Sequence, residues 1–541
     1  MALSEIKPGC SVSRAEEGEV RQHAYFTKTR VGAAAVSLAM IAHGLYLFGR
    51  YDTKWALVGM AVGLAVLAAV FVSAGYLFEV PHWLRCDEVP FVLSFCLSVV
   101  IFVLLFVPGA VPDEFYHFNS TYKYSDILTG REVSDTSISM REDDIRFTES
   151  VLSNRVSRDS YKAVAQNFSL FAENVSYSNK AVNSSYSMTA NVPQQRVPAA
   201  LGIVFAKILG LGSVPLFYIG RLFNAAYSCM LIILAVRITP VGKNIFKSIA
   251  LLPMTLHLVG SYSYDGPSMG FAFLLSALIF KAIFDEKTLE TKDLITITLI
   301  AVLLAPCKTI YVLIAFAALI IPCARFANKK TEVVFKTGII VAAVGVVLLL
   351  RMSSLLMAAG ASTGGDGLSY RGDEVGYSYT IHDFITRPIM AIMLFLRSFD
   401  YFGGEWIMKT LGGSLGWFQE EISAPMYLNY AYLVLLFLSC VAVRKCEKEI
   451  AVHLRLVFGA ISVFVILAAI MSMATSWTFN TDYYIYGVQG RYFLPVLPLL
   501  LLSIRPKNLV YTVDSADMLT VTSTFLTMFY VCRIFVIGMS I

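Results

Sequence analysis

Apolar stretches of membrane-spanning length alternate along this chain with short polar segments that contain many Lys and Arg residues. A helix of about 20 apolar residues crosses a bilayer, and most of these stretches approach that length. They lie at about 31–48, 55–78, 89–108, 214–236, 247–261, 266–284, 293–305, 309–324, 337–358, 425–443, 452–474, 491–503 and 516–538. The pattern predicts an all-α polytopic integral membrane protein with about 13 transmembrane helices, or 11 to 14 if the shorter stretches are counted differently.

Composition agrees with this fold class. Hydrophobic residues make up 57% of the 541 residues, charged residues 15%, and the mean hydropathy is +0.66, which is too apolar for a soluble globular protein. The net charge of +5 is small, and the basic residues lie between apolar stretches, which marks orientation in a membrane and gives no sign of nucleic-acid binding. The nine cysteines lack the paired spacing of a zinc site and predict no disulfide framework.

The distribution of Lys and Arg over the short loops predicts an N-terminus in the cytoplasm. The same rule places the two long polar segments outside the cytoplasmic membrane, the first of them as a small cap after the third helix. The expected organisation is a cytoplasmic tail (1–30), an additional N-terminal transmembrane hairpin (31–88), a membrane core (89–505) with outer segments at 109–200 and 359–424, and a C-terminal transmembrane helix (506–541).

Two adjacent carboxylates, Asp113 and Glu114, follow the third apolar stretch in the segment Pro112-Asp113-Glu114-Phe115-Tyr116-His117-Phe118. Proline ends a helix, so this pair is expected on a turn at the membrane surface, where a carboxylate can serve as a general base. An acidic helix end that merely stays in water is an equally simple interpretation.

Further ionisable and aromatic residues fall at the same predicted face of the membrane. They are His117, Tyr264, Asp265, Lys308 and Arg491. Charged groups near membrane depth cost about 2.5–3.5 kcal/mol each, so they usually face a cavity or a partner. Singly, Lys308 and Arg491 could extend to lipid headgroups, and Asp265 could cap the helix that follows it. Together, a carboxylate beside two cations suits transfer of a group from a lipid phosphate.

Six short blocks occur in the order seen in a bacterial membrane-protein family. They are Pro112-Asp113-Glu114-Phe115-Tyr116-His117-Phe118, Gly220-Arg221-Leu222-Phe223-Asn224, Leu251-Leu252-Pro253-Met254-Thr255, Tyr264-Asp265-Gly266, Lys308-Thr309-Ile310-Tyr311 and Gln489-Gly490-Arg491-Tyr492-Phe493-Leu494-Pro495. Over roughly residues 89–505 the chain resembles the family called domain of unknown function 2142 (DUF2142). Phe115 departs from the family pattern, which often has Pro after the acidic pair.

The resemblance implies a fold and a function, because that family is grouped with the GT-C glycosyltransferases. These enzymes carry an acidic motif in the first outer loop and commonly use polyprenyl-phosphate sugars, so the expected partners are a lipid-linked sugar donor, a glycan or lipid-linked acceptor, and membrane lipids. Asp113 is then the expected base, and Glu114 is expected to support it by orienting the acceptor or, if a divalent metal is used, by helping to hold that metal. The residues expected to bind substrate or phosphate are His117, Arg221, Tyr264, Asp265, Lys308, Arg491 and Tyr492.

Two other functions fit the sequence. A transporter or flippase for a lipid-linked saccharide would place ionisable residues near the bilayer midplane, whereas here the middles of the apolar stretches are nearly free of charge. A non-catalytic membrane protein of envelope assembly would need no carboxylate pair at all.

Overall fold

The computed structural model describes residues 88–541, with gaps at 132, 135–136, 152–154, 182–191, 359–367, 372–373, 445–446, 507–510 and 514–516. The expected tail 1–30 and the expected hairpin 31–88, except for Glu88, lie outside the described residues. The chain divides into two compact units, Met1–Ser94 and Phe95–Ile541. All residues of the expected site belong to the second unit.

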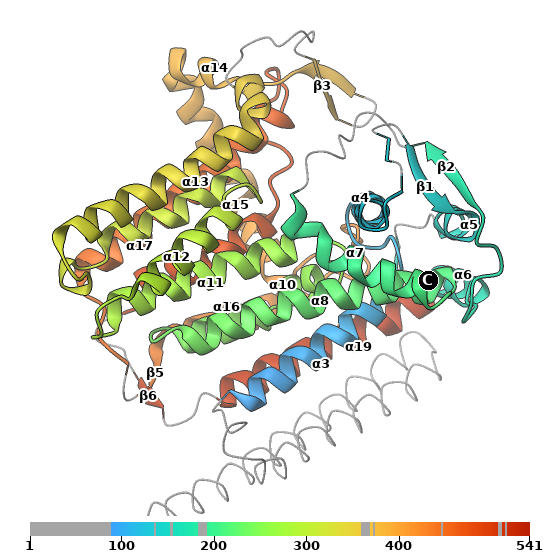
Figure 1. Ribbon diagram of the computed structural model, residues 1–541, viewed down its shortest axis with the longest axis horizontal. Coiled ribbons are helices and arrows are strands. Elements are labelled where there is room, and N and C mark those ends of the chain that lie inside the picture. The colour runs from blue at the N-terminus through green and yellow to red at the C-terminus, as the bar shows by residue number, and fades with distance from the viewer. Residues whose placement is uncertain are drawn as a thin grey trace, which may run out of the picture. The chain divides into compact units, whose positions relative to one another are not determined.

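Helices dominate the described chain (Figure 1). They are α3 (Val89–Leu105), α4 (Glu114–Leu128), α5 (Glu142–Ser150), α6 (Arg158–Gln166), α7 (Pro193–Ile208), α8 (Ser213–Ile238), α9 (Lys243–Ala250), α10 (Pro253–Val259), α11 (Asp265–Phe284), α12 (Thr291–Leu304), the 3₁₀ helices η3 (Thr309–Ile320) and η4 (Cys323–Arg325), α13 (Lys329–Ala358), α14 (Ile381–Thr386), α15 (Pro388–Leu411), α16 (Met426–Val441), α17 (Val452–Ser476), the 3₁₀ helix η5 (Gly490–Val496), α18 (Leu497–Ser503) and α19 (Asp517–Ser540).

Three short strand pairs accompany the helices. β1 (Ser137–Arg141) pairs antiparallel with β2 (Tyr177–Ala181), and β3 (Leu368–Arg371) pairs antiparallel with β4 (Glu374–Tyr377). β5 (Ala442–Arg444) pairs in parallel with β6 (Tyr511–Val513). Figure 1 shows β1 and β2 with α5 and α6 at one end of the helices of this unit and β5 and β6 toward the other end. The sequence pattern did not predict these strands.

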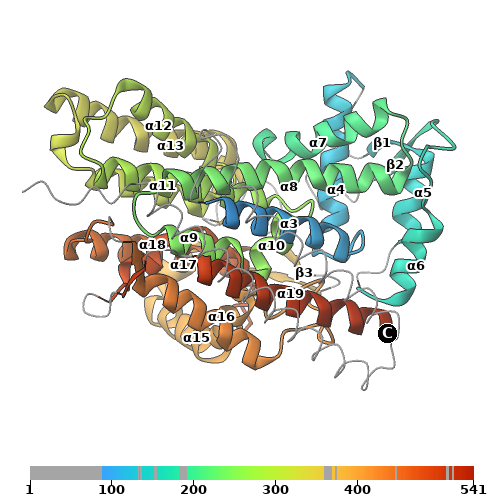
Figure 2. The ribbon, with the colours of Figure 1, turned by 90° about the horizontal axis from the view of Figure 1, so that it is seen from below.

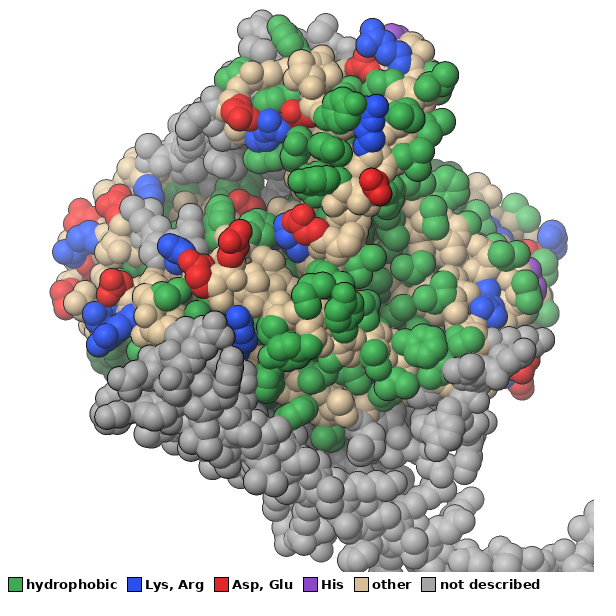
Figure 3. Space-filling model, turned by 180° about the vertical axis from the view of Figure 1, so that it is seen from behind, with side chains coloured by type: hydrophobic (Ala, Val, Ile, Leu, Met, Phe, Trp, Pro, Cys, Tyr) green, Lys and Arg blue, Asp and Glu red, His purple; other side chains and the backbone are tan. Residues whose placement is uncertain are grey.

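Five helices in the described residues are long and apolar enough to cross a membrane. They are Ser213–Ile238, Asp265–Phe284, Lys329–Leu350, Val452–Ser476 and Leu519–Ser540. Shorter apolar helices occur at Val89–Leu105, Thr309–Ile320, Met426–Val441 and Gly490–Ser503. Hydrophobic side chains cover a broad central band of the face in Figure 3, with most charged side chains to either side of it. These features are those of a polytopic helical membrane protein.

Two of the expected helices differ from the pattern in a physically informative way. The stretch 247–261 is divided into α9, which ends at Ala250, and α10, which begins at Pro253. Proline lacks the backbone N–H that would continue the first helix, and it fits the first turn of the second. The stretch 309–324 is mainly the 12-residue 3₁₀ helix η3, where a regular α-helix was expected. At about 2.0 Å per residue, η3 covers more distance than an α-helix of the same length.

The long helices α8 and α11 pack along one another, and α7 crosses α8 (Figures 1 and 2). Gly220 lies where α8 meets the loop between α10 and α11. A Cβ atom at Gly220 would lie 1.9 Å from the hydroxyl oxygen of Tyr262, so only glycine fits there. The close contact brings α8 against the loop that leads into Asp265 and so positions one side of the site.

Candidate functional site

Asp113 lies at the start of α4, in the connection from α3. Its backbone is left-handed, with φ 60° and ψ 16°, a region that Asp occupies more readily than most non-glycine residues. The side chain is 47% exposed, and its Oδ2 atom lies 3.9 Å from Nη2 of Arg491. Burial raises the pKa of the Asp113 carboxyl, while Arg491 opposes the rise and the Asp265 carboxylate adds to it. The carboxylate is therefore accessible and more basic than an ordinary aspartate.

Three largely buried charged side chains from different elements meet beside Asp113. Asp265 is the first residue of α11, Lys308 precedes η3, and Arg491 is the second residue of η5. The Nζ atom of Lys308 lies 2.7 Å from Oδ1 of Asp265, and the Nε atom of Arg491 lies 3.3 Å from Oδ2 of Asp265. One carboxylate thus holds two cations side by side, and such a pair of cations favours a bound phosphate.

These contacts can be compared with the simpler interpretations, in which Lys308 and Arg491 extend to lipid headgroups and Asp265 caps a helix. Lys308 and Arg491 are only 17% and 10% exposed, and they pair with Asp265, so neither extends freely into solvent. The Asp265 carboxylate faces these cations, and the N-cap residue of α11, Tyr264, makes no side-chain capping bond. The structure therefore brings Asp113, Asp265, Lys308 and Arg491 together as one charged cluster.

Aromatic rings surround the ammonium group of Lys308. Its Nζ atom lies 4.0 Å from the ring centroid of Tyr492 and 5.4 Å from that of Tyr264. Tyr311 donates a hydrogen bond of 3.1 Å to the backbone carbonyl of Tyr492, which ties η3 to η5. Rings at these distances attract a cation electrostatically and restrict its side-chain rotamers. Tyr264 and Tyr492 therefore belong to the site as neighbours that fix the position of Lys308.

Glu114, the second carboxylate of the pair, points away from this cluster into the protein. It forms an ion pair with Arg221 of α8, and neither side chain has any exposed surface. The Nε and Nη2 atoms of Arg221 lie 2.8 and 2.5 Å from the two carboxylate oxygens. Backbone N–H groups of Gly109 and Tyr262 also donate to this carboxylate, at 3.0 and 3.3 Å.

Arg221 uses its remaining N–H groups to bond the last carbonyl groups of α3. Nη1 donates to the carbonyl oxygens of Val103 and Phe106, at 2.9 and 2.5 Å, and Nη2 donates to that of Val107 at 3.3 Å. The carbonyl groups at a helix C-terminus have no partner within the helix and need one when they are buried. The Glu114–Arg221 pair therefore fastens the end of α3, the start of α4 and α8 to one another. Neither group has a surface on which to meet a substrate.

The expected two-carboxylate metal site does not fit this geometry. The oxygens of Glu114 already accept hydrogen bonds from Arg221 and from backbone N–H groups, and Asp113 faces Arg491. Within the described residues, no group of three or more His, Cys, Asp and Glu side chains is arranged to hold a metal ion. Asp113 and Glu114 therefore do not face a shared point at which both could bind one metal ion.

His117 lies one turn into α4 and contacts a buried arginine that the sequence pattern had not indicated. Its Nδ1 atom lies 2.7 Å from Nη2 of Arg196 on α7, and its ring packs against Tyr264 at 4.9 Å. Arg196 also donates to the carbonyl of Tyr262 at 3.1 Å. Burial and the nearby Arg196, Arg491 and Lys308 cations hold the pKa of His117 well below its usual range. His117 is thus a neutral acceptor that joins α4 to α7.

Comparison with known proteins identifies the family. The family model described as predicted membrane protein, DUF2142, matches residues 96–500. The chain belongs to this family. None of the curated proteins and none of the solved structures matches it. The DUF2142 match runs from α3 to α18 and includes Asp113, Asp265, Lys308 and Arg491.

A small pocket lies next to the charged cluster of this DUF2142 protein, and we call it the inner pocket. It has a volume of about 10 Å³, which is room for about one water molecule. Its lining residues are Pro112, Met254, His257, Lys409, Ser414, Gly416, Phe418, Gln489, Gly490 and Arg491. Because Pro112 precedes Asp113 and Arg491 contacts it, this pocket adjoins the accessible carboxylate.

Three polar residues at the DUF2142 site had not been singled out from the sequence. Arg196 follows Gln194 and Gln195, His257 lies between two leucines, and Gln489 occurs only within one of the six matched blocks. The one sequence signal for Arg196 was its charge just before an apolar stretch, because a charged group is costly to bury without a partner. Which partner it meets depends on helix packing that spacing alone does not give.

Proposed function

We propose that this DUF2142 protein is a GT-C-type membrane glycosyltransferase. It transfers a sugar from a polyprenyl-phosphate-linked donor to a cell-envelope glycan or lipid-linked acceptor at the outer face of the cytoplasmic membrane. The observation that carries the proposal is the accessible, unusually basic Asp113 carboxylate beside Arg491, within a cluster that also holds Lys308. A base next to two cations matches the charges that such a transfer develops.

In the proposed reaction, Asp113 removes the proton from an acceptor hydroxyl group. The acceptor oxygen then bonds to the anomeric carbon of the donor sugar, and the bond from that carbon to the phosphate oxygen breaks. The electron pair of the broken bond stays on the polyprenyl phosphate. Lys308 and Arg491 stabilise the negative charge that develops there. Asp265 holds the two cations in position before the donor binds.

The other site residues hold the catalytic base and the phosphate-binding cation in position. The buried Glu114–Arg221 pair holds the connection that carries Asp113, so Glu114 supports the base through the backbone and does not orient the acceptor itself. Tyr264 and Tyr492 restrict Lys308, and His117 packs on Tyr264. Rigid support of this kind matters because a small displacement of a catalytic group lowers the rate strongly.

The membrane arrangement in the proposal has about 13 transmembrane helices, a cytoplasmic N-terminus and outer segments at 109–200 and 359–424. Lys and Arg residues in the opposite loops support that orientation. Asp265, Lys308 and Arg491 lie at the beginnings of α11, η3 and η5. Ionisable groups at helix ends suit an enzyme at the membrane surface better than a transporter, whose charged groups lie near the midplane.

Transfer from a radiolabelled polyprenyl-phosphate sugar pool tests the proposal in membranes that contain equal amounts of wild type or variant. Loss of the base is expected to lower transfer about 10²- to 10⁴-fold in Asp113→Asn. Asp159→Asn is the matched control, because Asp159 is 90% exposed on α6. Absence of transfer by the wild type with every lipid-linked sugar in the pool, or an undiminished rate in Asp113→Asn, would contradict the proposal.

A further inference from the structure

A second, larger cavity shares the lining residue Phe418 with the inner pocket, and we call it the outer cavity. It has a volume of about 380 Å³ and is open to the surface. This volume falls in the range of about 300–1,000 Å³ that small-molecule sites occupy. The residues that line it are Arg155, Trp417, Phe418, Gln419, Glu420 and Glu421.

Phe418 belongs to the walls of both cavities. Its ring lies 5.0 Å from the Nζ atom of Lys409, which lines the inner pocket. Its backbone has φ 54°, and Asp113 is the other non-glycine residue with positive φ in the described part of the chain. A bulky residue in this conformation is strained and is retained only where its surroundings hold it. The Phe418 side chain is thus common to the outer cavity and to the pocket beside Asp113.

The segment that carries Phe418 is anchored on both sides. Gln419 accepts a hydrogen bond of 2.8 Å from the N–H of Val156 and donates one of 3.1 Å to its carbonyl. The N–H of Gly416 donates to Nε2 of His257 at 3.3 Å. These bonds hold the chain in place on both sides of Phe418.

The inner pocket presents polar atoms that call for a polar ligand. Nδ1 of His257 and Oε1 of Gln489 have no hydrogen-bond partner among the described residues. His257 is 97% buried, since its exposed fraction is 3%. A buried polar atom without a partner costs about 1–3 kcal/mol, so a hydroxyl group that bonds to these atoms would be favoured there.

We propose that the outer cavity binds an uncharged saccharide, the acceptor, and that the Phe418 side chain must move for its hydroxyl group to reach the inner pocket and Asp113. Trp417 offers an exposed ring face to the apolar side of a sugar ring. The carboxylate of Glu420 accepts hydrogen bonds from hydroxyl groups. Arg155 is neutralised by its ion pair with Glu421, so the cavity keeps the negative charge of Glu420, which disfavours an anionic ligand.

The identification of the bound saccharide as the acceptor rests on the proposed function. The first test of the binding site, however, needs neither the donor nor sugar transfer. The purified protein in lipid nanodiscs is titrated with glucose, galactose, mannose, N-acetylglucosamine or the anionic glucuronate, and tryptophan fluorescence is recorded. At least one uncharged sugar is expected to give a saturable change in the wild type that is lost in Trp417→Phe. The same sugar is expected to bind about tenfold more weakly to Glu420→Gln, which loses a charged acceptor.

No saturable change that depends on Trp417 with any of these sugars, or binding of glucuronate as tight as that of glucose, would overturn the binding site. Because this measurement is independent of catalysis, absence of transfer activity would count against the proposed function and leave the binding result as it stands.

The role of Phe418 is tested by access to the inner pocket. A cysteine replaces Ser414, which lines that pocket, and a membrane-impermeant thiol reagent is added to the outside of intact cells. Labelling of Ser414→Cys is expected to be several-fold faster when Phe418→Ala is added. Phe168→Ala is the matched control, because Phe168 is exposed and lines neither cavity. Equal labelling rates with and without Phe418→Ala would overturn the proposed role of Phe418.

Discussion

The Nη2 atom of Arg491 lies 3.9 Å from the Oδ2 atom of Asp113 in the charged cluster. The two residues come from opposite ends of the family match. The separation is too long for a hydrogen bond and short enough for strong electrostatic coupling. The cation lowers the pKa of Asp113, yet burial outweighs it and the net pKa is raised. The Asp113 carboxylate is therefore a stronger base than an ordinary aspartate.

The raised pKa of Asp113 predicts the acid side of the pH profile for transfer. Only the ionised carboxylate can act as base, so the rate falls as the pH drops through the pKa of Asp113. The midpoint is expected above about 3.9, the ordinary value for aspartate. Initial rates at saturating donor between weakly acidic and neutral pH measure it, and Asp113→Asn is expected to lack this limb. A midpoint at or below the ordinary value would argue against Asp113 as the base.

Arg491 is expected to contribute to donor binding more through the planar shape of its guanidinium group than through its charge. Arg491→Lys keeps one positive charge but loses the planar group that can hold two phosphate oxygens in parallel bonds. The KM for the lipid-linked donor is expected to rise about tenfold or more, with a smaller change in the KM for the acceptor. Arg146→Lys is a suitable control, since Arg146 is 66% exposed on α5. An unchanged donor KM in Arg491→Lys would remove Arg491 from the phosphate site.

Glu114 is expected to stabilise the folded protein, as a partner in the buried ion pair with Arg221. Removal of one partner from a buried ion pair costs about 3–5 kcal/mol, because the other charge is left buried without compensation. The free energy of unfolding of purified Glu114→Gln should fall by about that amount. Glu286→Gln breaks an exposed pair with Lys448 and should change the free energy of unfolding far less. If Glu114→Gln unfolds like the wild type but loses transfer, its role is catalytic.

The neighbouring carboxylates Asp113 and Glu114 show which features could be predicted from the sequence and which could not. Length and hydropathy were sufficient to place α8 and α17 within about two residues, because a uniform apolar stretch leaves few choices. The adjacent acids carry no such periodic signal. One faces the charged cluster and the other faces Arg221, and this difference comes from the left-handed backbone at Asp113. The residue pattern therefore identified charged residues that the fold brings together, and the packing determined what each of the two carboxylates contacts.

The pair of His117 and Arg196 predicts how stability depends on pH. The folded pKa of His117 lies well below its usual value of about 6.5, so in acid the unfolded chain binds a proton that the folded protein does not. This residue therefore lowers stability as the pH falls below about 6.5, by up to about 1.4 kcal/mol per pH unit. The slope of unfolding free energy against pH should be smaller in His117→Gln than in the wild type.

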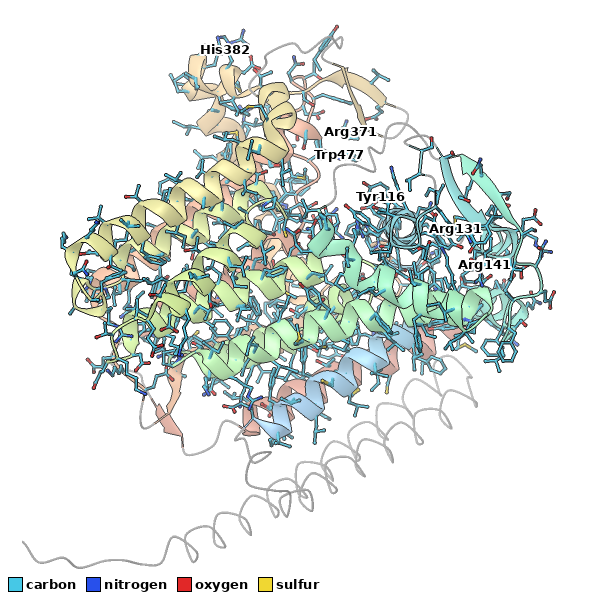
Figure 4. The ribbon with its side chains drawn as sticks, viewed as in Figure 1. Tyr116, Arg131, Arg141, Arg371, His382 and Trp477 are labelled. Atoms are coloured by element: carbon cyan, nitrogen blue, oxygen red, sulfur yellow. The ribbon has the colours of Figure 1, made fainter. Side chains whose placement is uncertain are left out.

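The control for His117→Gln is His382→Gln, because His382, which is labelled in Figure 4, is exposed. Its removal should leave the slope nearly unchanged. Equal slopes in the wild type and in His117→Gln would show that His117 is protonated in the folded protein, and the assignment of a neutral acceptor to Arg196 would fail.

Membrane orientation gives the last prediction, since every proposed step needs the charged cluster to face outward. Glu173 is exposed in the loop between α6 and β2, and Glu449 is exposed in the loop between β5 and α17, toward the other end of the long helices. A membrane-impermeant thiol reagent added to intact cells should label Glu173→Cys, and it should label Glu449→Cys only after the membrane is opened. Both variants are expected to fold, because each replaces an exposed side chain in a loop. The reverse labelling pattern would place the cluster in the cytoplasm, where a soluble nucleotide sugar would replace the lipid-linked donor as the natural substrate.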